Sequence, residues 1–219
     1  ILNDAIKVIE KKKGKRLVES EENKKIINIL EKFLVKKKLI CYGGTAINNI
    51  LPEKDQFYDK TIEFPDYDFF STNALNDAKE LADIYFKANY QEIEAKAGLH
   101  AGTFKVFVNF KPIADITQLD STIFRMLKND AIIKNKIYYA PPNFLRMSMY
   151  LELSRPDGDV SRWEKVLKRL ILLNKNYPLK GIECNSFNFD KEFKGTHDKE
   201  KIINIIKKVA LQEKLVFFG

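Results

Sequence analysis

The sequence predicts an α/β fold in which a small mixed sheet is followed by a mostly helical segment. Up to about residue 140, short apolar runs typical of buried strands alternate with patterns of helical period. Beyond Pro141 and Pro142, long helical patterns dominate. With 219 residues, 45% of them hydrophobic, the chain is long enough to bury a core of this kind. We therefore expect residues 1–140 to form one domain and residues 141–197 a helical segment.

The first elements in chain order are a helix, a buried strand and a short second helix. Residues 20–38 begin with a capping serine and two glutamates, carry apolar residues at helical spacing, and end in lysines. The apolar run at residues 39–42 is typical of a buried strand. The two glycines that follow break this strand, so a short helix is expected at residues 45–51, before Pro52 ends it.

The remaining elements follow from the same two periodicities. In the first part we expect a strand at residues 66–70, a helix at 73–88, and strands at 90–94, 103–110 and 113–116. In the second part we expect helices at residues 143–154, 159–174 and 198–214.

An internal repeat links the two ends of the chain. Residues 25–29 (KIINI) recur at residues 201–205, and the same offset aligns residues 39–43 with residues 215–219. We favour a duplication, so that residues 198–219 begin a truncated second domain; the alternative is two unrelated amphipathic helices, each followed by an apolar strand. The chain also begins at Ile1 and stops inside an expected strand, which indicates a fragment of a longer protein.

Composition narrows the classes of function. The formal charge of +8 and pI near 9.2 favour polyanionic partners, although the basic run at residues 36–38 also suits a helix end. No signal peptide and no apolar run of about 18 residues is present, so we expect an intracellular protein without a membrane partner. Cys41 and Cys184 show no zinc-site spacing and are expected to be free thiols.

Two aspartates lie on either side of a tyrosine at Asp66-Tyr67-Asp68, directly before Phe69 and Phe70. On an extended strand both carboxylates point to one face and Tyr67 points to the other. Carboxylates side by side repel each other unless a cation lies between them. The alternative is an exposed turn with two solvated aspartates, but the flanking aromatic residues favour a buried strand.

A third acid, Asp115, stands alone in the apolar run at residues 112–116. Taken by itself, it is more simply an aspartate at the end or edge of a strand. Taken after Asp66 and Asp68, it completes a set of three carboxylates of the kind that hold divalent ions.

Gly43 and Gly44 lie between the buried strand and the short helix. Without a Cβ, the backbone amides can approach an oxygen-rich ligand, and the helix start adds unpaired N–H groups and the positive end of its dipole. Together with Thr45, the pair suits a triphosphate, whereas a tight turn is the simpler interpretation of the glycines alone.

This order of two glycines, an Asp-x-Asp pair and a later strand aspartate resembles the DNA polymerase β-like nucleotidyltransferase superfamily, although the interval before Asp66 is longer than usual. The resemblance implies two divalent ions, Mg²⁺ or Mn²⁺. It implies that Asp66 and Asp68 bind both ions and that Asp115 binds the ion at the attacking hydroxyl. It further implies that residues 43–45 hold the triphosphate, and that residues 1–140 form the catalytic domain.

Five segments carry a closer resemblance: residues 42–48 (YGGTAIN), 51–52 (LP), 64–71 (FPDYDFFS), 154–157 (SRPD) and 162–163 (RW). They resemble the poly(A) polymerase catalytic subunits of large nucleocytoplasmic DNA viruses, the giant amoebal viruses most of all. The resemblance implies template-independent transfer of AMP from ATP to an RNA 3′-hydroxyl, in the virion and in the viral factory of the host cytoplasm. It also implies a second, degenerate nucleotidyltransferase-like domain, in agreement with the repeat.

Basic residues near the second predicted helix of the helical segment are candidates for the triphosphate. Similar enzymes use basic helix residues in this way, which suggests Arg155, Arg162 and Lys165 as nucleotide-binding residues; Lys168 and Arg169 are expected on a solvated face. Two alternatives stay open: another polymerase β-like enzyme acting on tRNA or a small molecule, and an inactive RNA-binding homologue. The sequence also leaves open whether the protein forms a homo-oligomer.

Overall fold

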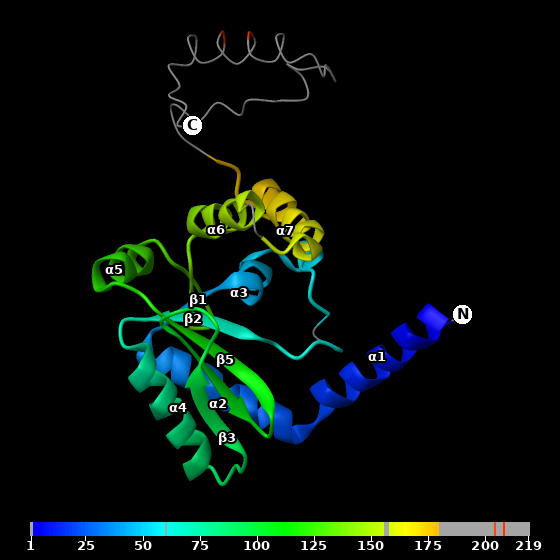
Figure 1. Ribbon diagram of the computed structural model, residues 1–219, viewed down its shortest axis with the longest axis vertical. Coiled ribbons are helices and arrows are strands. Elements are labelled where there is room, and N and C mark those ends of the chain that lie inside the picture. Colours follow the sequence, from blue (N-terminus) through cyan, green and yellow to red (C-terminus); the bar gives the residue numbers. More distant parts are fainter. Residues whose placement is uncertain (1, 60, 156–157, 180–203, 205–207, 209–219) are drawn as a thin grey trace. The chain divides into compact units, whose positions relative to one another are not determined.

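The computed structural model of the chain describes residues 2–59, 61–155 and 158–179, together with residues 204 and 208. The described residues up to Tyr177 belong to one compact unit, in which helices cover both faces of a single sheet (Figure 1). The predicted α/β class, with a mixed sheet followed by helices, is confirmed.

Seven strands form the sheet within the described residues, in the order β3-β4-β5-β2-β1-β7-β6. They are β1 (Ile40–Tyr42), β2 (Tyr67–Ser71), β3 (Ile93–Ala97), β4 (Thr103–Val108), β5 (Lys111–Gln118), β6 (Ile132–Lys134) and β7 (Ile137–Tyr139). β2 runs parallel to β5 and antiparallel to β1, and β1 runs parallel to β7. The three strands that carry the candidate site, β1, β2 and β5, are therefore neighbours in the middle of the sheet.

The described residues form seven α-helices, of which the first packs against the second and extends away from the sheet, while the others lie around the sheet. The helices are α1 (Leu2–Glu19), α2 (Glu21–Lys37), α3 (Gly43–Ile50), α4 (Ala74–Lys87), α5 (Ser121–Asn129), α6 (Pro142–Ser154) and α7 (Trp163–Asn176), with 3-10 turns η1 (Glu53–Asp55) and η2 (Val160–Arg162). Figure 1 shows α2 and α4 on one side of the central strands and α3, α6 and α7 on the other.

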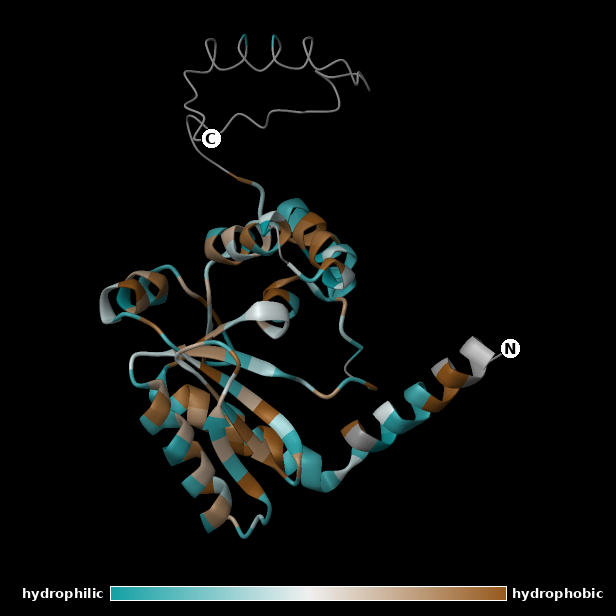
Figure 2. Cartoon of the chain, in the orientation of Figure 1, coloured by the Kyte–Doolittle hydropathy of each residue, from teal (hydrophilic) through white to brown (hydrophobic). Residues whose placement is uncertain are grey.

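The core forms because each element buries one apolar stripe. In α2, Ile26, Leu30 and Leu34 are fully buried at helical spacing, and full burial of such a side chain contributes about 1.5–3 kcal/mol. Figure 2 shows hydrophobic residues concentrated where α2 meets the strands. The Tyr85 hydroxyl of α4 donates to the backbone oxygen of Ile26 at 2.8 Å, which joins the two helices on this face.

Most predicted elements are found, with shifted ends. The short helix α3 starts at Gly43, two residues before its expected start. The strand expected at residues 90–94 is β3, which starts only at Ile93 because Asn89 and Glu92 have positive φ angles of 63° and 49°. β6 and β7 were not predicted, because strands of three residues are too short to show a periodicity.

The chain's later part was expected to be helical, and α6 and α7 pack in the same compact unit as the sheet. The boundaries expected at residues 140 and 197 stay a prediction. Only Asn204 and Lys208 of the repeat at residues 201–219 are among the described residues, so the duplication also stays a prediction.

Candidate active site

The register of the central strands brings the predicted aspartates together. Asp68 of β2 is paired with Asp115 of the parallel strand β5 and with Tyr42 of β1, so these three side chains share one face of the sheet. Tyr67 points to the opposite face, where its hydroxyl donates to Glu31 of α2 at 2.6 Å. Asp66 lies directly before β2, two residues from Asp68, and the charges of Asp115, Lys105 and Lys165 act on its carboxylate.

The aspartates perturb one another's ionisation. Burial first, and then the negative charges of Asp66 and Asp115, together raise the pKa of Asp68 to about 7. The pKa of Asp66 is also raised, first by burial and then by the charge of Asp115. Such mutual repulsion is relieved when cations lie among the carboxylates.

One side chain already supplies a cation. Lys105 of β4 is the cross-strand partner of Asp115, and its ammonium donates to Asp115 Oδ2. The other oxygen, Oδ1, is buried and has no hydrogen-bond partner within the described part of the chain. A buried carboxylate oxygen without a partner is unfavourable in isolation and fits a ligand position for a hard divalent cation.

Three carboxylates are chemically suitable ligands for divalent ions. In the described residues, however, they are not arranged as a complete metal-binding site. No group of three or more His, Cys, Asp or Glu side chains in the described ranges is arranged to hold a metal ion. The ammonium of Lys105 on Asp115 is one reason, because it takes up an oxygen that a cation would use.

The two glycines are required by close contacts at the start of α3. Gly43 has a φ angle of +71°, and a Cβ there would lie 2.4 Å from Asp68 Oδ2. A Cβ on Gly44 would lie 2.4 Å from the Tyr58 hydroxyl oxygen and 3.0 Å from Arg169 Nη2. The backbone at the helix start therefore passes between the carboxylate of Asp68 and a buried cation.

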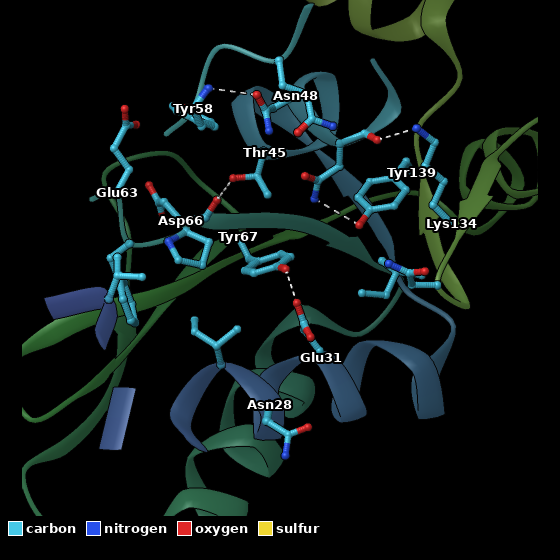
Figure 3. A pocket seen from close by; sticks show the side chains of 18 of the residues that line it. Asn28, Glu31, Thr45, Asn48, Tyr58, Glu63, Asp66, Tyr67, Lys134 and Tyr139 are labelled. Atoms are coloured by element: carbon cyan, nitrogen blue, oxygen red, sulfur yellow. Dashed lines mark hydrogen bonds between the residues drawn. The ribbon is translucent and has the colours of Figure 1, made fainter. Parts of the chain in front are cut away.

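Thr45 ties this helix start to the carboxylates. Its hydroxyl donates to the backbone oxygen of Asp66, a bond that Figure 3 shows from the cavity side. The bond fixes the start of β2 against α3, which orients the Asp66 backbone toward the glycine motif.

Figure 3 looks into a cavity of roughly 1210 Å³ between α2, α3 and the loop that precedes β2. Thr45, Asp66 and Lys165 are among its lining residues, and so are Glu31 and Tyr67. The cavity thus reaches Asp66 from the face of the sheet that α2 covers.

The predicted basic residues differ in their surroundings. Arg162 forms an ion pair with Glu152 at 3.0 Å, and its charge lowers the pKa of Asp68. Lys165 has a lowered pKa, caused first by burial and then by the charges of Arg169 and Arg162. Arg155, just beyond α6, is exposed, and its side chain makes no hydrogen bond or ion pair within the described residues.

Arg169 was expected on a solvated face, and this expectation is wrong. It is 8% exposed, its Nη2 donates to the Tyr58 hydroxyl at 2.7 Å, and its guanidinium lies 5.0 Å from the ring centre of Phe57. Its Nε is buried without a hydrogen-bond partner in the described part of the chain. The sequence contained one indication that Arg169 faces the site. Arg162, Lys165 and Arg169 are spaced by three and four residues, which places them on one helical face. Lys168, between them, is exposed as expected.

The loop that lengthens the interval before Asp66 is held by α7. Asp55 accepts from Lys175 Nζ at 2.7 Å and from Asn176 Nδ2 at 3.0 Å, and Tyr58 is bonded to Arg169. At its other side, Asn48 Oδ1 accepts from the backbone N–H of Tyr58 at 2.9 Å (Figure 3). The loop therefore connects α3 to α7 and keeps the basic face of α7 at the glycine motif.

In the described ranges, no helix combines the length and the apolar character needed to cross a bilayer.

Comparison with known proteins places these features in a family. Residues 28–159 match the family model described as poly(A) polymerase catalytic subunit. A protein of African swine fever virus named as a poly(A) polymerase catalytic subunit is 31% identical over 185 residues, covering 82% of this chain and 38% of that protein. A protein of Acanthamoeba polyphaga mimivirus with the same name is 29% identical over 195 residues, covering 87% of this chain and 32% of that protein.

Among solved structures, the polyadenylate synthase of Megavirus is similar with a TM-score of 0.74 and 28% sequence identity. The similarity covers 95% of this chain and 41% of the Megavirus chain. The chain thus spans about two fifths or less of the length of these relatives.

Proposed function

The chain belongs to the poly(A) polymerase catalytic subunit family, and we propose that it carries the catalytic carboxylates of a template-independent poly(A) polymerase. The reaction transfers AMP from ATP to the 3′-hydroxyl of RNA and releases pyrophosphate. The observation that carries the proposal is the pairing of Asp68 with Asp115 beside the glycine-opened helix, inside the segment that matches the family.

Asp66, Asp68 and Asp115 are the residues that would hold two Mg²⁺ or Mn²⁺ ions. The unpartnered oxygen of Asp115 and the raised pKa values of Asp66 and Asp68 support this assignment. When bound, such ions polarise the phosphoryl oxygens and lower the pKa of the attacking hydroxyl. The carboxylates would orient the ions, and the family resemblance implies that Asp115 would hold the ion at the attacking RNA 3′-hydroxyl.

The triphosphate of ATP would lie between the start of α3 and the basic face of α7. Gly43, Gly44 and Thr45 present the helix start, whose unpaired N–H groups and dipole favour a polyanion. On the opposite side, Arg162 and Lys165 supply cations; burial, and then the nearby charges of Arg169 and Arg162, lower the pKa of Lys165. Arg155, exposed just beyond α6, is included as a nucleotide-binding residue on the family resemblance alone.

The partners of this activity are ATP and the 3′ end of RNA. The named relatives are viral proteins, which supports a viral enzyme that acts in mRNA processing, with the virion and the viral factory of the host cytoplasm as its sites. No membrane partner is part of the proposal.

An RNA extension assay tests the proposal. The full-length protein is incubated with a short RNA, one nucleotide at a time, and Mg²⁺ or Mn²⁺; we expect extension with ATP. Asp68→Ala should reduce the rate on the order of a hundredfold or more, because ion-holding groups contribute several kcal/mol to the transition state. Asp83→Ala, which removes an exposed acid on α4, is the matched control and should keep the wild-type rate. Near-normal extension by Asp68→Ala would contradict the assignment, and extension of tRNA alone would favour a tRNA-modifying enzyme.

A further inference from the structure

Lys105 is a cation that the proposed mechanism does not use. It lies on β4, next to β5 in the sheet, and the strand register pairs it with Asp115. Its ammonium donates to Asp115 Oδ2, on the same carboxylate whose other oxygen, Oδ1, has no partner in the described residues and is the ligand position proposed above. The side chains of Lys105 and Asp115 are 36% and 18% exposed, so the pair lies at the mouth of the site and not in the sealed core.

The influence of Lys105 reaches all three acids. Its positive charge lowers the pKa of Asp66 and of Asp68, opposing the effects of burial and mutual repulsion. Lys105 is the cation in direct contact with this cluster among the described ion pairs. In the metal-free protein it therefore supplies charge compensation that divalent ions would otherwise supply.

The contact between Lys105 and Asp115 also opposes the binding of a divalent ion to Asp115. An ammonium bonded to Oδ2 and an ion using the same carboxylate would be cations within a few ångströms of each other, which is electrostatically unfavourable. The flexible four-carbon stem of lysine and its partial exposure allow the ammonium to move away into solvent. The two cations thus compete for one carboxylate group.

We propose that Lys105 is a built-in competitor of the divalent ion at Asp115: it stabilises the metal-free carboxylate cluster and must release Oδ2 when the ion binds. This inference rests on the proposed function, because it takes the three acids to be the ion-holding residues. Lys105 is in this sense a positioning residue that sets the affinity for the ion.

Direct Mn²⁺ binding tests the competition. Free Mn²⁺ is measured by its electron paramagnetic resonance signal during titration of the full chain at low ionic strength, without ATP or RNA. Lys105→Met removes the competing ammonium, and we expect Mn²⁺ to bind about two- to fivefold more tightly, the effect of losing one partially exposed ionic partner. A purely structural role of Lys105 predicts the reverse, namely weaker binding.

Lys96→Met is the matched control. Lys96 lies on the neighbouring strand β3 as the cross-strand partner of Lys105, but its ammonium bonds Glu94 Oε2 at 2.7 Å. The Lys96→Met substitution removes the same charge as Lys105→Met from the same region of the sheet. We expect it to change the Mn²⁺ affinity by less than about twofold.

Two further variants make the result specific to the pair. Lys105→Gln keeps a polar group and serves if the methionine variant fails to fold; it should also tighten Mn²⁺ binding. In an Asp115→Asn background, Lys105→Met should tighten Mn²⁺ binding clearly less than it does with Asp115 intact, since the contested carboxylate has lost its charge. Unchanged or weaker binding in both single variants of Lys105 would overturn the proposal.

The outcomes separate this inference from the proposed function. If the wild-type chain extends RNA and binds Mn²⁺ while the Lys105 variants show no gain, the competition is wrong and the polymerase assignment stands. If the wild-type chain binds no Mn²⁺ even at millimolar concentration, both the ion-holding assignment and the competition are wrong.

Discussion

At the scale of single residues, Asp68 shows that the carboxylate cluster opposes folding. Its pKa of about 7 lies above the value of about 3.9 expected in the unfolded chain. Between these two pH values the folded state binds a proton that the unfolded state does not. The free energy of unfolding therefore decreases as pH rises through this window, and above pH 7 the full penalty for the ionised carboxylate is present.

We therefore predict that Asp68→Asn stabilises the metal-free protein. In the presence of a chelator at pH 8, the variant should exceed the wild type by on the order of 2 kcal/mol in free energy of unfolding, because it carries no buried charge. The difference should shrink as pH falls toward and below about 4, because the wild-type carboxyl then becomes protonated in the unfolded state as well as in the folded state. Urea unfolding across this pH range measures it. Asp83→Asn, at an exposed position of α4, is the control, and a variant curve parallel to wild type at all pH values would contradict the prediction.

Gly43 is a second residue that matters at this scale, because its backbone conformation allows close contact with the Asp68 carboxylate. We predict that Gly43→Ala destabilises the protein by at least about 1 kcal/mol and also weakens Mn²⁺ binding, because the new Cβ combines a strained φ with a contact on Asp68 Oδ2.

The matched control for this change is Gly102→Ala. Gly102 has a φ of +78°, but its Cβ would lie 3.3 Å from Gln118 Cβ, away from the acids. Thermal unfolding should report a comparable backbone penalty in both variants, whereas Mn²⁺ binding should be lost only in Gly43→Ala. Equal Mn²⁺ affinities in the two variants would show that the contact with Asp68 is unimportant.

At the scale of elements, α7 is the helix that completes the site. Its last turn holds Asp55 of the loop between α3 and β2, its first turn carries Lys165, and its middle places the buried Arg169 beside Gly44 at the start of α3. Because the buried Nε of Arg169 has no hydrogen-bond partner in the described residues, we infer that it donates to a phosphate oxygen when the nucleotide binds. The loop that makes the spacing of the motif unusual is thus part of the packing that places these cations.

We predict that Arg169→Met raises the KM for ATP about tenfold or more while kcat changes less, since a charge-assisted contact to the bound nucleotide is lost. Steady-state extension kinetics with ATP as the varied substrate measure the effect. Lys168→Met changes the charge one residue away, at an exposed ion pair with Glu164, and should leave KM within about twofold. Equal KM values in the two variants would remove Arg169 from the nucleotide site.

At the scale of the whole molecule, we expect the excess of basic residues to strengthen binding of the proposed RNA substrate. The formal charge of +8 favours a polyanion through release of counterions, whereas ATP contacts only a few groups at the site. We predict that RNA affinity, measured by fluorescence anisotropy, falls steeply between about 50 and 200 mM salt, while ATP affinity changes less. RNA affinity that does not respond to salt would favour an enzyme with a small-molecule substrate.

Much of the fold and part of the candidate site could be predicted from the sequence, because these features depend on residues that are close together in the chain. The strand alternation of Asp66 and Asp68, the glycines after β1 and the helical spacing of α2 each depend on residues close together in the chain. The family resemblance rested on the same short motifs, and the family is confirmed.

Only the tertiary structure decided which distant residues meet. The pairing of Asp68 with Asp115 depends on the register of β2 and β5, and the contact of Lys105 with Asp115 depends on the register of β4 and β5. The burial of Arg169 depends on a loop that folds back over α7. Sequence periodicity reports which face of an element is apolar, but register and loop packing are set by contacts between segments far apart in the chain, so the counterion at Asp115 and the buried cation at Gly44 emerged only from the fold.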